Sequence, residues 1–283
     1  MPEADGSTLA EADVTSRSGP RIVAIANQKG GVGKTTTAIN LAAALAEQGR
    51  TVLIADLDPQ GNASTGLGVQ PSERKWTIYD VLMGHRSLHD AMIPTAVEGL
   101  WLIPSSSDLA SIDLELSRQP DRSGRLRKAF SESLSAARKF DFVILDCPPS
   151  LNLLTVNAMV AADSVLLPLQ SEFFALEGLS QLMMTIRQIR TKANPELRIE
   201  GVLLTMHDAR NNLAQQVEAD ARANLGDLVF RTIVPRNVRV SEAPSFGVPV
   251  LRYDTQSRGA QAYRSLANEI MTRLGYSVKE NGN

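Results

Sequence analysis

The sequence has one cysteine and no long apolar run, and each shortage excludes a class of protein. Cys147 alone cannot form a disulfide framework or a cysteine-rich metal cluster within one chain. No apolar run approaches the roughly 20 residues that a membrane-spanning helix needs. The first twenty residues lack the basic start and the apolar centre of a secretion signal. These absences favour a cytoplasmic protein.

The sequence also lacks an excess of charge of either sign. The 283 residues carry a formal net charge of -2, with 43% hydrophobic and 21% charged residues, which is ordinary for a globular protein. This balance argues against a protein that is basic over its whole surface. It leaves room for a local basic patch, because binding to nucleic acid depends on where the charges lie.

The chain shows no internal repeat and no linker rich in Pro, Gly or Ser. Residues 1–20 are polar, acidic and rich in Ser and Gly, which predicts a disordered N-terminal tail. Residues 276–283 are also polar and predict a short C-terminal tail. We therefore expect one domain, over residues 21–275.

Short apolar runs alternate with segments of helical periodicity. The runs, which predict strands, are "RIVAIAN", "TVLIADLD", "LWLIPS", "DFVILDC", "SVLLPLQ", "IEGVLLTM" and "LVFRTIV". The predicted helices cover residues 34–48, 125–139, 151–161, 176–191, 213–225 and 260–274. This alternation indicates an α/β fold, a doubly wound and mainly parallel sheet flanked by helices.

Polar segments follow four of these runs. They are "NQKGGVGKTT", "DLDPQGN", "DCPPS" and "VPRNVRVSEAPS". Ligands of doubly wound sheets bind beyond the carboxyl ends of the strands. We therefore expect the four segments to converge on one rim and form a single site.

The first polar segment has the features of a phosphate-binding loop, although Gln28 stands where the ordinary pattern has glycine. Glycines in a strand-to-helix turn let backbone N–H groups point at phosphate oxygens, beside the positive end of the helix dipole. Lys34 would reach the β- and γ-phosphates, and the hydroxyl of Thr35 would bind Mg²⁺. The predicted nucleotide-binding residues of this loop are Gly30, Gly31, Val32, Gly33, Lys34, Thr35 and Thr36. A glycine-rich turn without a ligand is the alternative.

Two further carboxylates are candidates for the same site. Asp146 ends a buried run, where it could hold Mg²⁺ directly or through water, or simply end the strand before Pro148. Asp58 could orient the attacking water, lie close to Mg²⁺, or cap a turn. Asp56 would point to the same side of an extended strand. Asp58 is preferred as the catalytic group because Pro59 and Gly61 mark a turn that begins there.

The remaining titratable groups show no pattern of their own. His85, His89 and His207 lack metal-ligand or general-base spacing. Cys147 has no histidine nearby in the sequence, so a buried, inert thiol is expected.

Together, these motifs resemble the ParA/Soj family of chromosome and plasmid partition ATPases. The resemblance is carried by "KGGVGKTTT", "DLDPQGNAS", "DCPPS", "LQSEFFALEGLSQL" and "PRNVRVSEAPSFGVPVLRYD", and it covers residues 21–274. It implies a P-loop NTPase of the deviant Walker A type, which binds ATP and Mg²⁺ and hydrolyses ATP. The helix-turn-helix domain of some plasmid members is missing, which argues against sequence-specific DNA binding.

The resemblance assigns a role to the second lysine of the loop. In this family the lysine that matches Lys29 crosses the interface of a nucleotide-sandwich dimer and contacts the ATP of the partner subunit. A cation supplied in this way stabilises charge on the transferring phosphoryl group, so Lys29 joins Lys34 and Asp58 as a candidate catalytic residue. Gly30 would lie where the two loops meet, with little room for a side chain. A solvated Lys29 is the alternative.

The resemblance also implies contacts with the base and with DNA. The "PRN" loop would bind adenine through Pro235 and Asn237, and Met206 would either pack on the base or belong to the core. Arg210 and Arg239 match DNA-contacting positions of the family. Dimerisation would bring two copies of each onto one face, giving a patch that binds phosphates without reading sequence.

The resulting expectation is a cytoplasmic, nucleoid-associated partition ATPase. ATP would drive homodimerisation and non-specific binding of double-stranded DNA, and a ParB-type centromere-binding protein would stimulate hydrolysis and release. No membrane partner is expected. A membrane-cycling ATPase of the MinD type is the alternative, but it needs a basic amphipathic C-terminal helix where this chain has "LGYSVKENGN". An iron–sulfur ATPase would need paired cysteines from each subunit.

Overall fold

The computed structural model describes residues 19–133, 140–172 and 175–278. Most of the predicted N-terminal tail therefore lies outside the described residues, as do residues 279–283 of the predicted C-terminal tail and residues 134–139 of one predicted helix. No helix in the described part of the chain is long and apolar enough to cross a membrane.

The centre of the fold is a seven-stranded sheet in the order β3-β4-β2-β5-β1-β6-β7. Every pairing is parallel except the β3–β4 pairing at one edge. The strands are β1 (Arg21–Ile25), β2 (Val52–Asp56), β3 (Ile93–Pro94), β4 (Leu100–Ile103), β5 (Phe142–Asp146), β6 (Ser164–Gln170) and β7 (Arg198–Thr205). The carboxyl ends of all the parallel strands therefore meet at one rim.

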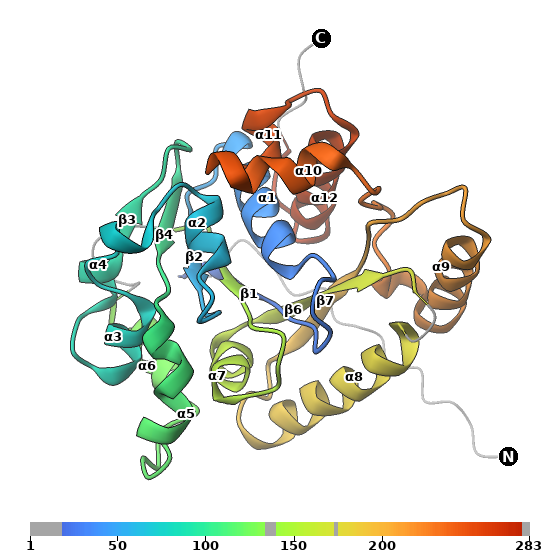
Figure 1. Cartoon of the computed structure of the whole chain (residues 1–283). Coiled ribbons are helices and arrows are strands. Elements are labelled where there is room, and N and C mark those ends of the chain that lie inside the picture. The colour runs from blue at the N-terminus through green and yellow to red at the C-terminus, as the bar shows by residue number, and fades with distance from the viewer. Residues whose placement is uncertain (1–18, 134–139, 173–174, 279–283) are drawn as a thin grey trace, which may run out of the picture.

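Helices cover both faces of this sheet (Figure 1). One layer contains α1 (Lys34–Glu47), α2 (Asn62–Gly66), α10 (Val238–Glu242), α11 (Val250–Tyr253) and α12 (Arg258–Arg273). The other contains α3 (Ile78–Met83), α4 (Leu88–Ala91), α5 (Ile112–Glu115), α6 (Arg125–Ser133), α7 (Leu153–Ala161), α8 (Ala175–Lys192) and α9 (Asn212–Leu225). The predicted doubly wound α/β class is confirmed.

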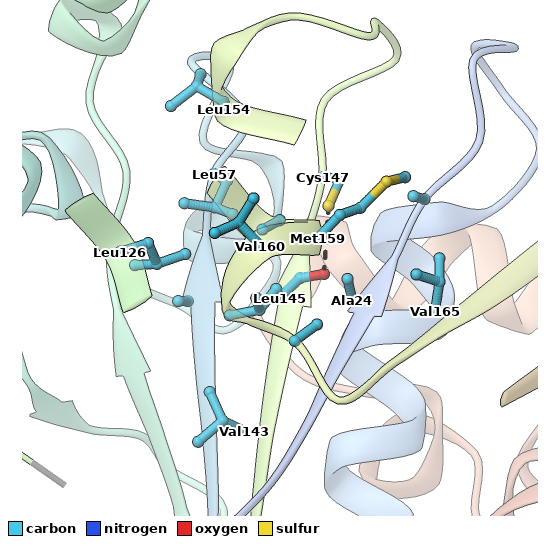
Figure 2. Close-up of a cluster of buried hydrophobic side chains, with 14 of the residues drawn as sticks. Ala24, Leu57, Leu126, Val143, Leu145, Cys147, Leu154, Met159, Val160 and Val165 are labelled. Atoms are coloured by element: carbon cyan, nitrogen blue, oxygen red, sulfur yellow. Dashed lines mark hydrogen bonds between the residues drawn. The ribbon is translucent and has the colours of Figure 1, made fainter. Parts of the chain in front are cut away.

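The strands alternate their side chains between two hydrophobic cores. Val23 and Ile25 of β1 pack into the α1–α12 layer, whereas Ala24 packs into the opposite layer. Figure 2 shows part of the second core, where Cys147 lies among Leu145, Met159 and other apolar side chains. The thiol is fully buried and donates weakly to the Leu145 carbonyl at 3.9 Å. The predicted burial of the thiol is therefore confirmed, and burial raises its pKa, which disfavours the reactive thiolate.

The predicted seventh strand, residues 228–234, is not a strand of the sheet. It begins at the end of a 3₁₀ turn and contacts β7 through an isolated bridge between Val229 and Val202. The amides of Phe230 and Val234 donate to the β7 carbonyls of Val202 and Leu204, both at 2.9 Å. Between them, the amides of Arg231 and Thr232 donate to the carboxylate of Glu269 on α12, both at 2.9 Å. A side chain from a distant helix thus interrupts the ladder that the apolar pattern predicts.

Sequence periodicity also missed the smallest elements. β3 has two residues and ends in Pro94, which an edge strand tolerates because its N–H side needs no partner. The helices α2, α3, α4, α5, α10 and α11 have four to six residues each, too few to show a helical period.

Candidate nucleotide-binding site

A cavity of about 590 Å³ opens at the rim formed by the carboxyl ends of the strands. All four polar segments contribute to its walls, although "DCPPS" contributes only Pro149. β1 lies between β5 and β6, so the loop that follows it leaves the sheet where the chain connections change direction. This is the place where doubly wound sheets bind nucleotides, and the volume lies in the range of small-ligand sites. The predicted convergence of the segments is therefore observed.

The loop between β1 and α1 has a backbone that only glycine adopts easily. Gly31 and Gly33 have φ angles of 76° and 87°, and Gly33 is the N-cap residue of α1. The loop is tied to the end of β7, because Thr205 Oγ1 donates to the Val32 carbonyl at 2.8 Å. Val32 itself is buried outside the cavity wall, so only its backbone is available to a ligand.

Lys34 is held in place by the loop that it follows. Its side chain is buried, and Nζ donates to the carbonyl of Lys29 at 2.9 Å. Burial lowers the pKa of Lys34, while the charges of Asp146 and Asp58 oppose this shift. A buried cation at the wall of a cavity has most to gain from a ligand that carries negative charge. Thr35 and Thr36 line the same wall.

Asp146 is a buried carboxylate near the Thr35 hydroxyl and the Lys34 ammonium, both of which favour its charged form. It is fully buried at the end of β5, and neither oxygen has a hydrogen-bond partner in the described part of the chain. Burial, reinforced by the charge of Asp56, raises the pKa of this carboxyl well above its usual range. Uncompensated buried charge is costly unless a cation is bound, so Asp146 fits the role of a ligand in the coordination shell of Mg²⁺.

The structure separates the two aspartates that follow β2. Asp56 is fully buried, and its carboxylate accepts from the amide of Asp58 and from both the amide and the hydroxyl of Ser64. It therefore organises the start of α2. Asp58 lines the cavity, and its Oδ1 accepts from the Gln60 amide at 3.0 Å, as in a turn. The geometry is compatible with both interpretations of Asp58, as a turn-forming residue and as a group that faces a ligand.

Lys29 lies outside the cavity formed by its own chain. Its Nζ pairs with Glu172, which follows β6, and both side chains are about half exposed. Exposed ion pairs of this kind contribute only about 0–1 kcal/mol. The amine is therefore not committed to this partner and can be drawn to a more strongly charged one.

Nothing in the part of the chain that the structure describes requires glycine at position 30. Its φ angle is not positive, and an added Cβ would meet only the Cβ of Pro149, at 4.0 Å. This contrasts with Gly31 and Gly33, whose positive φ angles require glycine. Any steric demand on Gly30 must come from a molecule outside the protomer.

Three predicted base contacts lie on one wall of the cavity. Met206, Pro235 and Asn237 all line it, from the segments after β7 and before α10. The two segments are bonded to each other through a bridge between His207 and Pro235. Met206 is half-buried and has a φ angle of 50°, so it belongs to the cavity wall and not to the hydrophobic core. This placement favours the first of its two interpretations.

The two predicted DNA-binding arginines lie on the surface beside this wall. Arg210 is highly exposed and binds the carboxylate of Asp208 through two nitrogens, at 3.0 and 2.9 Å. The hydrogen bonds from Arg210 lower the pKa of Asp208 to about 2. Arg239 pairs with Glu242 at 3.0 Å and with Asp254 at 3.4 Å. Both guanidinium groups therefore have acidic neighbours with which DNA phosphates would compete.

Several residues of the cavity wall had not been singled out from the sequence. They are Gln60, Asn62, Pro149, Thr205, Val234, Arg236, Val238, Val240, Ser241 and Tyr263. Gln60 and Asn62 stand within the motif "DLDPQGN", so their polarity next to Asp58 was an available signal. Tyr263 comes from α12, which the sequence predicted only as a helix over residues 260–274. Its position in the wall depends on how α12 packs on α1.

Known proteins match almost all of this domain. The family model described as "AAA domain" matches residues 20–199. The chromosome partitioning protein ParA of Caulobacter vibrioides is 57% identical over 253 residues, covering 89% of this chain and 94% of that protein. This chain belongs to the ParA/Soj family of partition ATPases. The Soj protein of Bacillus subtilis is 49% identical, with 88% and 98% of the two chains covered.

Solved structures agree with this family assignment. A Mycobacterium smegmatis structure described as cobyrinic acid a,c-diamide synthase with bound ADP and magnesium has a TM-score of 0.78 and 36% identity, covering 93% of this chain and 100% of that one. The septum site-determining protein MinD of Pyrococcus horikoshii, complexed with Mg-ADP, has a TM-score of 0.72 and 30% identity, covering 90% and 98% of the chains. The fold of this chain is therefore shared with two proteins whose structures contain ADP and magnesium.

Proposed function

We propose that this protein is a ParA-type partition ATPase. ATP binding drives formation of a sandwich dimer, the dimer binds double-stranded DNA without sequence preference, and a ParB-type partner stimulates hydrolysis and release. One observation carries the proposal: a buried lysine and a buried aspartate flank a glycine loop, while the second loop lysine lies outside its own cavity. Binding to the nucleoid would follow from binding to DNA.

Different residues of the cavity would bind different parts of ATP. The amides of the glycine loop and the Lys34 ammonium bind phosphate oxygens, and the wall formed by Met206, Pro235 and Asn237 contacts the base. Thr35 and Asp146 would hold Mg²⁺, which when bound neutralises charge on the phosphates. Asp58 lines the same cavity and would accept a hydrogen bond from the attacking water and orient it, or would join the Mg²⁺ shell.

Dimerisation is proposed to complete the site. Lys29 leaves its exposed pair with Glu172 and contacts the triphosphate bound by the partner. A triphosphate offers a more concentrated negative charge than one carboxylate, which favours this exchange. Hydrolysis would then depend on pairing, because part of the positive charge comes from the other subunit.

The proposed switch is tested by measuring DNA binding with ATP, with ADP and without nucleotide, at several salt concentrations. Tight and salt-sensitive binding is expected only with ATP. Equal affinity in all three states would remove the nucleotide switch from the proposal. Addition of a ParB-type centromere-binding protein is expected to accelerate both ATP turnover and release of DNA.

Gly30→Val is expected to bind ATP and yet remain monomeric. The φ angle of Gly30 and the 4.0 Å to its nearest neighbour leave room for a side chain within the protomer, so the fold should tolerate the change. Light scattering with a slowly hydrolysed ATP analogue measures the mass. Gly124→Val is the control, because its added Cβ would meet only the Asp121 carbonyl, at 3.7 Å. A normal dimer of Gly30→Val would contradict the proposed interface.

Arg239→Glu is expected to dimerise normally and to lose DNA affinity by at least about tenfold. The new carboxylate adds to Glu242 and Asp254 and repels phosphate in both copies of the dimer. The slope of log affinity against log salt is expected to change by about 2, one contact per subunit. Arg118→Glu, with the same charge change on an exposed residue between α5 and α6, is the control. Unchanged affinity of Arg239→Glu would place the DNA surface elsewhere.

Asp146→Asn is expected to stabilise the nucleotide-free protein while weakening the Mg²⁺ dependence of ATP binding. The folded-state pKa of Asp146 is raised above 3.8, so its favourable contribution is present at low pH and is lost as the pH rises. Asparagine carries no such charge. A buried unpaired group costs about 1–3 kcal/mol, and each kcal/mol shifts the unfolding midpoint by about 2–4 °C in a domain of this size.

Thermal unfolding from pH 5 to pH 8 measures this effect. The midpoint of Asp146→Asn is expected to exceed that of the wild type most at pH 8, with a smaller difference at pH 5. A lower midpoint at pH 8 would show that Asp146 has a stabilising partner.

The similarity to MinD makes a membrane-cycling ATPase the second candidate. Co-sedimentation with anionic liposomes in the presence of ATP separates the two. In the described part of the chain, the last helix, α12, buries its apolar face against α1 and is not available to a lipid surface. We therefore expect no ATP-dependent pelleting, and strong pelleting would favour the MinD-type cycle.

A further inference from the structure

Arg74 forms an unusual connection beside the candidate site. It follows a 3₁₀ turn over Pro71–Glu73 and is half-buried. Its guanidinium donates to the carbonyls of Gly61, Val69 and Ser105 and to the hydroxyl of Thr65. All four acceptors are neutral oxygens, so the group acts as a hydrogen-bonding brace and not as half of an ion pair in these contacts.

Arg74 joins two segments that are both hydrogen-bonded to the Asp58 carbonyl. Gly61 closes the turn that Asp58 opens, because the Gly61 amide donates to the Asp58 carbonyl at 2.9 Å. The Ser105 hydroxyl also donates to the Asp58 carbonyl, at 2.5 Å, while the Ser105 carbonyl accepts from Arg74 at 3.2 Å. Arg74 is thus one hydrogen-bonded step from the Asp58 backbone along two independent routes.

The conformation of Gly61 is matched to the presence of Arg74. A Cβ on Gly61 would lie 2.3 Å from Arg74 Nη1, far inside van der Waals contact. The φ angle of Gly61 is 63°, so glycine is favoured there for its backbone as well. The turn therefore leaves open the space that the guanidinium fills. This steric fit between Gly61 and Arg74 is independent of the hydrogen bonds and supports the same role for Arg74.

We propose that Arg74 is a positioning residue for ATP hydrolysis, which fixes the turn from Asp58 to Thr65 so that the Asp58 carboxylate meets the attacking water. The inference rests on the proposed role of Asp58. The planar guanidinium has five N–H donors in a fixed array, and it reaches acceptors in several directions at once. A lysine has a single nitrogen and cannot satisfy the same four acceptors.

The main test is Arg74→Lys, measured for nucleotide binding and for turnover at saturating ATP. The expected result is unchanged nucleotide affinity with turnover reduced about 10- to 100-fold, because small displacements of a catalytic group are costly. Arg127→Lys is the control, since Arg127 also donates to two carbonyls, of Val160 and Ala193, but away from the cavity. It is expected to leave turnover unchanged. Normal turnover in Arg74→Lys would overturn the inference.

Chemical rescue distinguishes positioning from general stability. Guanidinium chloride at low concentration is expected to restore part of the turnover of Arg74→Ala, whereas tetramethylammonium chloride at the same ionic strength is not. A guanidinium ion can re-form the planar array of donors, and the tetramethylated ion has no N–H group. Failure of guanidinium to restore turnover in a folded Arg74→Ala would count against a positioning role.

A second pair of variants tests the fit between Gly61 and Arg74. Gly61→Ala and Gly84→Ala place alanine at positive φ angles of 63° and 78°, but only the first would collide with Arg74. Gly61→Ala is expected to lose turnover, and the loss is expected not to add to that of Arg74→Ala. Gly84→Ala is expected to keep turnover. Additive losses would show that Gly61 and Arg74 act independently and would overturn the inference.

Asp58→Ala separates this inference from the proposed function. If Asp58→Ala loses turnover while Arg74→Lys keeps it, the Arg74 inference fails alone. If Asp58→Ala keeps normal turnover, the role of Asp58 fails and the Arg74 inference fails with it. Loss of turnover in both variants, with ATP binding retained, supports both.

Discussion

In Lys34→Ala, the affinity for Mg-ATP is expected to fall by about 100- to 4,000-fold, enough to abolish binding at ordinary nucleotide concentrations. Removing one member of a buried pair of opposite charges costs about 3–5 kcal/mol, and each 1.4 kcal/mol is a factor of ten in affinity. Lys34 is buried, and its position is set by the bond from Nζ to the Lys29 carbonyl. The charge lost here therefore cannot be replaced by water as it could at the surface.

Isothermal titration calorimetry with ATP and Mg²⁺ measures this affinity. Lys192→Ala is the matched control, because Lys192 is an exposed lysine at the end of α8. The Lys34→Ala protein is also expected to stay monomeric and to leave DNA unbound, because both steps follow ATP in the proposed cycle. Wild-type affinity in a folded Lys34→Ala would refute the phosphate-binding role of the loop.

The second large effect is expected in Asp58→Ala, with turnover reduced about 100- to 10,000-fold, the usual contribution of a positioned acid or base group. ATP binding and dimerisation are expected to persist, because phosphate binding comes from the loop and from Lys34. The dimer is then expected to outlast that of the wild type, since hydrolysis no longer ends it. Phosphate release measures turnover, and light scattering follows the dimer with time.

Asp56→Asn provides the contrast that the structure suggests. Asp56 holds the amide of Asp58 and the amide and hydroxyl of Ser64, so its loss is expected to lower the unfolding temperature. We expect Asp58→Ala to be stable but inactive and Asp56→Asn to be less stable than the wild type. That outcome would support a catalytic role for Asp58 and a structural role for Asp56. Rapid hydrolysis by Asp58→Ala would refute the assignment.

Short-range patterns were sufficient for much of the fold. The strands β1, β2, β4, β5, β6 and β7 match apolar runs, and the longer helices match segments of helical periodicity. Both signals arise from burial along a few consecutive residues, so they can be read locally. The failure at residues 228–234 has a non-local cause. Two of its amides, those of Arg231 and Thr232, donate to Glu269, which lies 38 residues from Arg231, and no local pattern predicts this contact.

The candidate site divides in the same way. The glycine loop, Lys34 and the strand-ending aspartates were identified from the sequence because spacing within one turn determines what they can bind. The sequence placed Asp56 and Asp58 on one side of an extended strand. Only the fold showed that the carboxylate of Asp56 is the one that accepts hydrogen bonds from Ser64. The complete burial of Asp146 could likewise be seen only with its surroundings in place.

By itself, then, the sequence determined the family, the order of the main elements and the residues that can contact a triphosphate, because these depend on neighbours along the chain. The tertiary structure decided which carboxylates are already satisfied, where Lys29 rests and how Arg74 braces the turn after β2. These properties depend on hydrogen bonds between segments that are distant in sequence, such as Arg74 with Ser105, 31 residues away. Tertiary packing brings such groups together, so these contacts cannot be predicted from the spacing of residues in the sequence.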